Sequence, residues 1–350
     1  MKTELIKLTK SNIDKAISEA AQILNDGGLV AFPTETVYGL GGNALDKEAS
    51  MKIYAAKGRP SDNPLIVHIA DISALNAITQ DVSDKACALA EAYWPGPLTM
   101  IMRKSDLVPY ETTGGLDTVA IRMPDNEIAL RLIKESSGYI AAPSANTSGR
   151  PSPTKAEHVM EDLDGRIQMI LDGGAVGIGI ESTIVDMSED IPTILRPGYI
   201  TPEMIEQVAG EVRMDPALME VSGTAKPKAP GMKYRHYAPK AQMILVRGRQ
   251  AETITKIQQL SSDDKASGRK VGIICTDESK DSYNADMVIS LGSRDNEEEI
   301  ARHLFDGLRQ FDEADVDIIY SECFDAPGLG IAVMNRMLKA AGHQIIDIQT

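Results

Sequence analysis

A proline-rich, basic segment, residues 226–240 (KPKAPGMKYRHYAPK), divides the chain in two and so constrains how it folds. It holds five bases, three prolines and no acid, in a chain of 350 residues whose 51 acids outnumber its 36 bases. Proline fixes φ and removes a backbone donor, which disfavours a continuous helix or central strand here. A length of 350 residues is typical of about two domains. We therefore predict domains at 1–212 and 241–350, joined by a linker at 213–240.

The two parts differ in their hydrophobic patterns. After residue 240, short apolar runs alternate with amphipathic stretches, which is typical of a Rossmann-like three-layer α/β domain. Strands are expected at 242–246, 270–275, 287–291, 316–320 and 345–348, and helices at 251–260, 297–310 and 331–341.

In residues 1–212 strands and helices mix without strict alternation, which favours an α/β fold with both parallel and antiparallel pairs. Helices are expected at 11–25 (capped by Ser11), 46–56, 83–94, 126–136 and 202–209. Strands are expected at 29–34, 64–70, 98–103, 118–123, 139–142, 169–172, 183–187 and 193–195.

Charge and cysteine content exclude several classes of protein. The net charge is −15, of which −9 falls in residues 251–350 (19 acids, 10 bases), so a general nucleic-acid coat is excluded. The cysteines Cys87, Cys275 and Cys323 form no CxxC pair, which excludes a disulfide framework or zinc ribbon. There is no signal-peptide pattern and no run of 18 apolar residues, so we expect a cytoplasmic protein without a membrane span.

Polar segments rich in glycine and proline follow several expected strands of the first domain. They bring four cations, Lys57, Arg59, Arg122 and Arg196, onto loops and strand ends. Neither GxxxxGK[ST] nor a GxGxxG after a strand occurs, so phosphate binding would depend on these side chains. The pattern predicts one anion-binding cavity, for a polyphosphate.

Each of these residues taken alone has a structural alternative. Lys57 and Arg59 could complement the dipole at a helix C-terminus instead of clamping an anion. Arg122 lies in an apolar strand, where it must either pair with a carboxylate or bind an anion. His68 lies within the apolar strand PLIVHIA, where a buried core histidine is the more common outcome, and Trp94 in YWPGPLT is expected to be structural. In the first segment, FPTETVYGLGG (32–42), Thr34, Glu35 and Thr36 follow a buried strand, and hydroxyls and glycines there could offer donors to a ligand. The alternative is an ordinary strand-to-helix turn.

These segments, in order, closely resemble the YrdC-like threonylcarbamoyl-AMP synthase family in its long, two-domain form. The matching residues are PTETVYGLG (33–41), KGRP (57–60), NPLIVHI (63–69), WPGPLT (94–99), VAIRMP (119–124), APSAN-SG (142–149), ESTIVD (181–186), LRPG (195–198) and APGMKYRHYAP (229–239). The resemblance implies a twisted mixed sheet with a concave cavity, an appended Rossmann-like domain and a linker that folds over the active site.

The implied activity is that of a nucleotidyltransferase. L-threonine, bicarbonate or CO₂, and ATP would give L-threonylcarbamoyl-AMP and pyrophosphate. This is the first step of threonylcarbamoyl-adenosine modification of tRNA beside the anticodon. A separate transferase would use the product, so tRNA would be only an indirect partner. Mg²⁺ would bridge the ATP phosphates, with its protein ligands left open and Glu35 a carboxylate that could lie near. An RNA-binding or regulatory module using the same cavity is the alternative reading.

The resemblance also assigns roles to individual residues. Lys57 and Arg59 would be catalytic, because phosphoryl transfer depends on positioned positive charge. L-threonine would contact Thr36, His68, Arg122, Ala142 (through its backbone) and Ser182. ATP would contact Lys57, Arg59, Asn63, Thr118, Ser144, Asn146, Ser152 and Arg196, together with Tyr234 or His236 from the linker.

Overall fold

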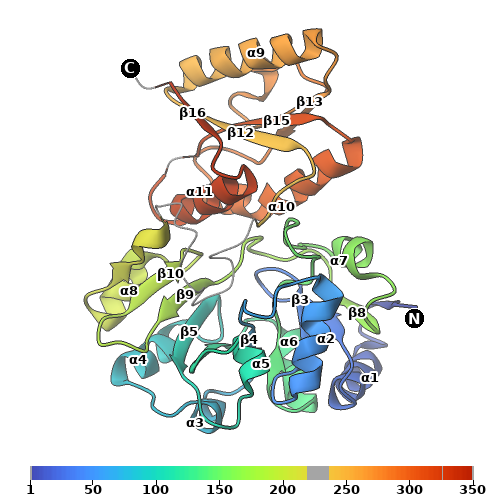
Figure 1. Cartoon of the computed structure of the whole chain (residues 1–350), viewed down its shortest axis with the longest axis vertical. Coiled ribbons are helices and arrows are strands. Elements are labelled where there is room, and N and C mark those ends of the chain that lie inside the picture. Colours follow the sequence, from blue (N-terminus) through green and yellow to red (C-terminus); the bar gives the residue numbers. More distant parts are fainter. Residues whose placement is uncertain (1, 219–235, 325, 349–350) are drawn as a thin grey trace. The chain divides into compact units, whose positions relative to one another are not determined.

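The computed structural model describes residues 2–218, 236–324 and 326–348. It divides into two compact units (Figure 1). The first comprises Met1–Ser148, Ser152–Gly177 and Glu181–Tyr234, and the second comprises Gly149–Pro151, Ile178–Ile180 and Arg235–Thr350. Residues 219–235 of the predicted linker, including Tyr234, lie outside the described residues. Among the described residues, no helix is long and apolar enough to span a bilayer.

The first unit is built on an eleven-stranded sheet with the order β1-β8-β2-β3-β7-β4-β6-β5-β9-β10-β11. Pairs such as β4–β6 and β5–β9 are parallel, whereas β2–β3 and β5–β6 are antiparallel, which confirms the predicted mixed sheet. The strands are β1 (Glu4–Lys7), β2 (Val30–Phe32), β3 (Gly39–Asn43), β4 (Ile66–His68), β5 (Leu98–Arg103), β6 (Thr118–Arg122), β7 (Ile140–Ala141), β8 (Met169–Asp172), β9 (Thr183–Asp186), β10 (Thr193–Arg196) and β11 (Arg213–Met214).

Helices of the first unit begin where the sequence supplies caps. The side chains of Asp46, Ser83, Asn126 and Thr201 each accept a backbone hydrogen bond from the first turn that follows. The helices are α1 (Ile13–Asn25), α2 (Lys47–Lys57), α3 (Leu75–Ile78), α4 (Asp84–Tyr93), α5 (Tyr110–Thr113), α6 (Glu127–Glu135), α7 (Ala156–Leu163) and α8 (Pro202–Ala209).

The start of α1 differs from the prediction. Asn12, not Ser11, precedes the helix, and its side chain makes no capping hydrogen bond. The Asn12 amide oxygen instead accepts a hydrogen bond from the backbone N–H of Thr9, at 2.7 Å. The side chain therefore stabilises the turn before the helix and not the helix itself.

The glycine run after β2 is a strand, where none was predicted from the sequence. Gly39–Asn43 forms β3, antiparallel to β2 and β7. A Cβ atom at Gly41 would lie 2.9 Å from both Phe32 Cε1 and Ile140 Cγ2, closer than real Cβ contacts allow. The sequence is glycine-rich here because neighbouring side chains pack directly onto this backbone.

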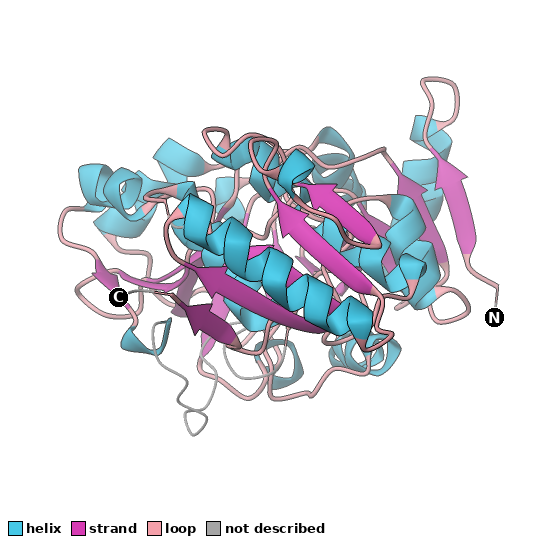
Figure 2. Ribbon diagram, turned by 90° about the horizontal axis from the view of Figure 1, so that it is seen from above, coloured by secondary structure: helices cyan, strands magenta, loops and turns pink. Residues whose placement is uncertain are grey.

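The second unit is an all-parallel five-stranded sheet in the order β14-β13-β15-β12-β16. Helix α9 covers one face, and α10 and α11 cover the other (Figures 1 and 2), which confirms the three-layer prediction. Its elements are β12 (Gln242–Arg247), α9 (Gln250–Ala266), β13 (Val271–Cys275), β14 (Met287–Ser290), α10 (Glu297–Ala314), β15 (Ile318–Glu322), α11 (Leu329–Ala340) and β16 (Ile345–Asp347).

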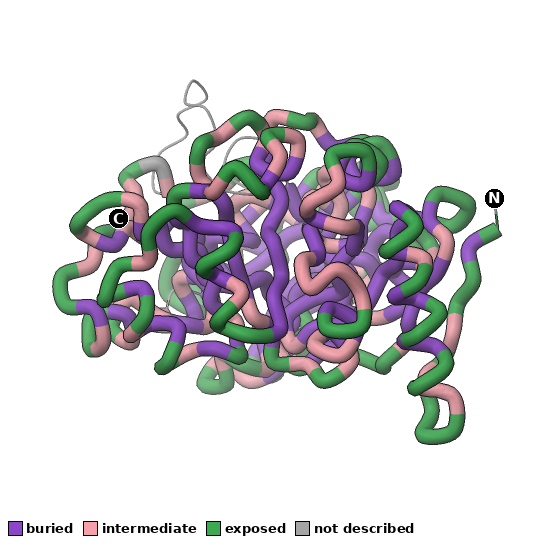
Figure 3. Tube along the Cα trace, turned by 90° about the horizontal axis from the view of Figure 1, so that it is seen from below, coloured by how far each residue is buried: buried purple, intermediate pink, exposed green. Residues whose placement is uncertain are grey.

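Burial follows this layering. In Figure 3 the buried stretches lie mainly in the interior and the exposed stretches mainly at the periphery, and strands such as β2, β4 and β13 are buried along their whole length. In the first unit the core includes Tyr38, Leu65, Met100 and Ile170, all fully buried. The apolar side chains thus fix the sheet, and the charged residues that are also buried need a separate explanation.

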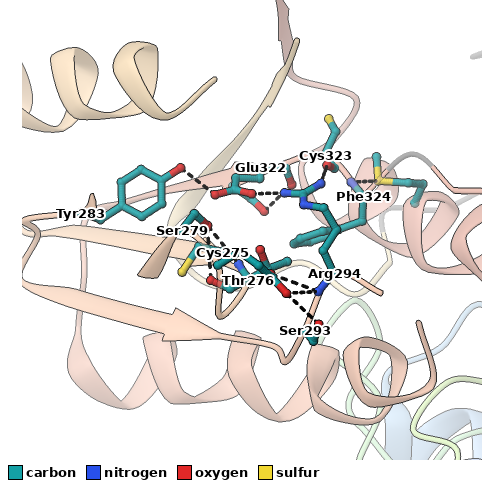
Figure 4. Close-up of polar contacts among 12 residues, drawn as sticks. Cys275, Thr276, Ser279, Tyr283, Ser293, Arg294, Glu322, Cys323 and Phe324 are labelled. Atoms are coloured by element: carbon teal, nitrogen blue, oxygen red, sulfur yellow. Dashed lines mark hydrogen bonds and ion pairs between the residues drawn. The ribbon is translucent and has the colours of Figure 1, made fainter. Parts of the chain in front are cut away.

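A polar network lies at the carboxyl ends of β13 and β15 in the second unit (Figure 4). Glu322, whose side chain is 1% exposed, forms an ion pair with Arg294 and accepts a 2.7 Å hydrogen bond from the Tyr283 hydroxyl. Arg294 Nη1 donates to the Cys323 carbonyl oxygen at 3.3 Å. Both Glu322 oxygens are therefore engaged, which ties the loop before α10 to the end of β15.

Candidate active site

The sheet register of the first unit brings a histidine, an arginine and a threonine side by side. His68 ends β4 and lies opposite Arg122 in the parallel β4–β6 pair. Thr99 of β5 lies opposite Arg122 on its other side. Residues paired in this way project from the same face of a sheet. Three strands far apart in the sequence thus place three polar side chains in one row.

Arg122 is 4% exposed and is held from several sides. Its Nη1 donates to Thr36 Oγ1 at 2.9 Å and its Nε to the Gly96 carbonyl oxygen at 3.4 Å. Its Nη2 lies 2.7 Å from Glu35 Oε1, an ion pair without the geometry of a hydrogen bond. The sequence left open whether Arg122 pairs with a carboxylate or binds an anion. The structure shows the carboxylate pair and also places Arg122 among predicted site residues, so both alternatives stay open.

His68 is uncharged in this setting. It is 3% exposed, and burial together with the positive charge of Arg122 lowers its pKa to about 3. Its Nδ1 lies 3.1 Å from the Ile66 carbonyl oxygen. The imidazole can therefore serve as a neutral hydrogen-bonding group beside Arg122, and it does not add a second positive charge.

Ser182 and Arg196 continue the polar row. Ser182 Oγ lies 2.7 Å from Thr99 Oγ1, and it accepts a hydrogen bond from Arg196 Nη2 at 3.1 Å. Arg196 Nε also donates to the Ser182 carbonyl oxygen, at 3.0 Å. We call Thr36, His68, Thr99, Arg122 and Ser182 the Arg122 cluster; it joins four of the five residues predicted for threonine.

Ala142, the fifth residue predicted for threonine, lies next to the cluster. Its backbone N–H donates to the Ile66 carbonyl oxygen at 2.9 Å, so this donor is already used within the sheet. Ala142 precedes the segment that carries Ser144 and Asn146, and Gly39 and Ser144 form an isolated β-bridge. The Arg122 cluster and this segment are therefore neighbours in the first unit.

Lys57 lies at the end of α2 and is 2% exposed. Its ammonium donates to the carbonyl oxygens of Ser144 and Asn146, the latter at 2.6 Å. The Ser144 hydroxyl in turn donates to Asn146 Oδ1, at 2.5 Å. We call Lys57, Ser144 and Asn146 the Lys57 cluster; it joins three of the residues predicted for ATP.

Arg59 is bonded within its own loop. Its Nε donates to the Asn63 carbonyl oxygen at 3.2 Å, and its Nη2 donates to that of Pro64 at 3.1 Å. The Asn63 side chain is 1% exposed, and its Oδ1 has no hydrogen-bond partner among the described residues. Lys57 and Arg59 thus each order a different loop, in addition to any role toward an anion.

Ser152 is 1% exposed and donates a hydrogen bond to Oε1 of Glu181, the residue before Ser182. The backbone places the Ser152 segment beside β3, because the Tyr38 N–H donates to the Pro153 carbonyl oxygen at 2.9 Å. The pair therefore connects a residue predicted for ATP with the segment that supplies Ser182.

Thr118, Tyr234 and His236 are the remaining residues predicted for ATP. Thr118 begins β6, four residues before Arg122, which at about 3.3 Å per residue places the two Cα atoms roughly 13 Å apart. It lines a separate groove of about 390 Å³ with Arg103, Lys104 and Asp117. Tyr234 lies outside the described residues, and His236 belongs to the second unit, where its ring lies 5.6 Å from that of Tyr237.

Sequence reasoning did not identify Glu35 as the partner of Arg122, nor Thr99 and Glu181 as members of these groups. The sequence offered Glu35 only as a carboxylate that could lie near Mg²⁺, and the structure shows it paired with Arg122. Within the described ranges, no three His, Cys, Asp or Glu residues are grouped so that they could hold a metal. The requirement that a strand arginine be paired was the available signal; which carboxylate pairs with it depends on tertiary structure.

Comparisons with known proteins agree with this architecture. Residues 22–198 match a family model described as "Telomere recombination", and residues 200–342 match one described as "Threonylcarbamoyl-AMP synthase, C-terminal domain". Together they define a two-domain enzyme of the synthase class.

Curated relatives match along nearly their whole length. The threonylcarbamoyl-AMP synthase of Pyrococcus abyssi is 53% identical (94% of this chain, 95% of the relative), and that of Bacillus subtilis is 52% identical (96% of each). A crystal structure of Pyrococcus abyssi Sua5 complexed with L-threonine superposes with a TM-score of 0.93 at 48% identity, covering 100% of each chain. The chain belongs to the threonylcarbamoyl-AMP synthase family.

Proposed function

We propose that the Arg122 and Lys57 clusters form the active site for the family reaction, in which L-threonine, bicarbonate and ATP give L-threonylcarbamoyl-AMP and pyrophosphate. The observation that carries the assignment is the burial of Lys57, Arg122 and Arg196 among hydroxyls in the first unit. Buried cations are costly unless they serve a specific partner. A threonine-bound relative of the same fold supports the assignment.

In this proposal the Arg122 cluster holds L-threonine. The Arg122 guanidinium binds the substrate carboxylate, because a planar fork matches a carboxylate in two-point geometry. Thr36, Ser182 and neutral His68 offer hydrogen bonds to the remaining polar groups of the amino acid. Ala142 contributes its carbonyl oxygen, since its N–H is already donated to Ile66.

ATP is assigned to the residues around the Lys57 cluster. The carbamate oxygen of carboxylated threonine attacks the α-phosphorus, and pyrophosphate leaves. Negative charge develops on the phosphate oxygens, so fixed positive charge from Lys57, Arg59 and Arg196 lowers the barrier. Polar contacts are assigned to Asn63, Ser144, Asn146 and Ser152. For Thr118, Tyr234 and His236 an ATP contact stays a prediction.

Mg²⁺ is proposed to enter with ATP, held mainly by phosphate oxygens, as is usual for an ion that gives up its waters reluctantly. The product is a mixed anhydride of a carbamate and AMP. A separate transferase would pass its threonylcarbamoyl group to tRNA in the cytoplasm and release AMP. Carboxylates in the second unit, whose residues 251–350 carry a charge of −9, make that unit a poor surface for RNA.

Pyrophosphate release tests the proposal. We expect release from ATP only when both L-threonine and bicarbonate are present. Release that is independent of either substrate would contradict the assignment. Tight, salt-dependent RNA binding without ATP turnover would instead favour an RNA-binding module.

A further inference from the structure

We propose that Glu35 is the residue that binds the α-ammonium group of threonine. This inference rests on the proposed function of the Arg122 cluster and deepens it. Threonine is a zwitterion at neutral pH. The positive charge of Arg122 complements its carboxylate, and the negative charge of Glu35 complements its ammonium group.

The first observation is the state of the Glu35 carboxylate. Its side chain is 13% exposed, and neither oxygen accepts a hydrogen bond from any described residue. Arg122 Nη2, 2.7 Å from Glu35 Oε1, also makes no hydrogen bond within the described part of the chain. Buried polar atoms are nearly always hydrogen-bonded in folded proteins, so unsatisfied atoms of opposite charge call for an explanation.

The second observation is how the rest of Arg122 is anchored. Nη1 is bonded to Thr36 and Nε to the Gly96 carbonyl oxygen. The guanidinium plane is therefore fixed without help from Glu35. A carboxylate that is not needed to hold the arginine, yet lies against it, is suited to a ligand that has its own positive charge.

An amino acid supplies the missing partners together. Its carboxylate accepts from Arg122 Nη2, and its ammonium group donates up to three hydrogen bonds, which Glu35 oxygens accept. His68 lies opposite Arg122 in the β4–β6 pair as a neutral imidazole, so it adds no positive charge that would repel the ammonium group. Recognition of both charges would restrict the site to free α-amino acids.

Ligand binding by calorimetry tests the proposal on the full-length chain. Wild type and Glu35→Gln are each titrated with L-threonine and with 3-hydroxybutyrate, which is threonine without the amino group. Glutamine keeps the size of the side chain and removes its charge. We expect Glu35→Gln to weaken L-threonine binding at least about tenfold, the scale of a hydrogen bond to a charged group, and to change 3-hydroxybutyrate binding less than about twofold.

The control is Glu19→Gln, an exposed position on α1 that pairs with exposed Lys15. This variant should change neither affinity. If Glu35→Gln weakened the binding of both ligands equally, Glu35 would act by positioning Arg122, and the proposal would be overturned. Tighter binding of both would mean that Glu35 competes with the substrate carboxylate, and it would also overturn it. If wild type bound no L-threonine, the proposed function itself would fail.

Discussion

Each unit of the chain buries a glutamate against an arginine near the end of a strand, but the two pairs differ in how completely they are hydrogen-bonded. In the second unit, Glu322 accepts from Tyr283 and pairs with Arg294, whose Nη1 donates to the Cys323 carbonyl oxygen. In the first unit, Glu35 lies 2.7 Å from Arg122, yet neither of its oxygens accepts a hydrogen bond from a described residue.

This is the difference we expect between a pair that stabilises the fold and a pair that binds a substrate. A buried charge pair stabilises a fold when its remaining lone pairs and protons are satisfied. The Arg294–Glu322 pair meets that condition at both carboxylate oxygens, although Arg294 Nε has no hydrogen-bond partner among the described residues. The pair joins a loop to the end of β15 (Figure 4). The Arg122–Glu35 pair does not meet the condition, which fits groups whose partners arrive with a substrate. Under the proposed function, the same two residue types would serve stability in one unit and recognition in the other.

The largest expected contrast is in local stability. We expect Glu322→Gln to lower the free energy of opening of β15 by about 3 kcal/mol, because an amide nitrogen would face Arg294 and charged hydrogen bonds would be lost. Glu35→Gln should cost only about 1 kcal/mol at the following strand β3, because it removes an ion pair with Arg122 but no hydrogen bond.

Amide hydrogen exchange in the full-length chain measures both values, since it reports opening of each strand separately. Glu322→Gln should leave L-threonine affinity unchanged. Equal costs for the two variants would remove the distinction between the pairs.

A second, smaller effect concerns His68, which lies beside Arg122. Its pKa is lowered to about 3 in the folded chain, from an ordinary value of 6.5, because of burial and then the arginine. When a base has a lower pKa in the folded chain than in the unfolded chain, the folded protein loses stability as the pH falls through the unfolded pKa. The stability that His68 contributes should therefore be fully present above about pH 6.5 and should decline from there toward about pH 3.

The isosteric variant His68→Asn should abolish that part of the decline in acid unfolding curves. The NMR shifts of the His68 ring should also stay constant between pH 5 and pH 8 in wild type. A ring titrating near pH 6.5 would show that the Arg122 cluster carries a second positive charge, and the comparison with the Arg294 pair would then no longer hold.

Much of the fold could be predicted from apolar patterns and from the residues that begin or end helices and strands. Strands β5 and β8 and helix α8 begin and end where predicted, since apolar runs or a proline at the first turn mark them. The edge strand β1 was not predicted, because three of its four residues are exposed and it has no alternating pattern. Helix α9 extends to Ala266, six residues beyond the prediction, through polar residues without apolar periodicity.

The site was predictable in its residue types but not in its pairings. Lys57, Arg122 and Arg196 stood out as cations in glycine- and proline-rich segments of an acidic chain. Which groups they touch depends on register: His68 reaches Arg122 only because β4 and β6 pair in parallel. The carbonyl oxygens that hold Lys57 come from a segment nearly ninety residues away, and no local pattern specifies such a contact.

The smallest expected effect concerns Glu278, which orders the loop that carries Arg294. Glu278 accepts hydrogen bonds from the Ser293 hydroxyl at 2.7 Å and from the Arg294 N–H at 3.1 Å, and these, led by the hydroxyl, lower its pKa to about 2. A carboxyl whose folded pKa is depressed contributes stability above its unfolded value of about 4.5, and this is lost as the pH falls toward 2. Because the carboxyl is exposed, solvent screening keeps the effect modest.

Hydrogen exchange at the amides of β14 should therefore show weakening below about pH 4.5 in wild type and a flatter profile in Glu278→Gln. Glu298→Gln, a change on the first turn of α10, is the matched control. The Arg122 cluster should be insensitive to Glu278→Gln, because its arginine is anchored by Thr36 and Gly96. If β14 were indifferent to the substitution, the loop would not depend on this carboxylate, and the Arg294–Glu322 pair would have to hold the loop by itself.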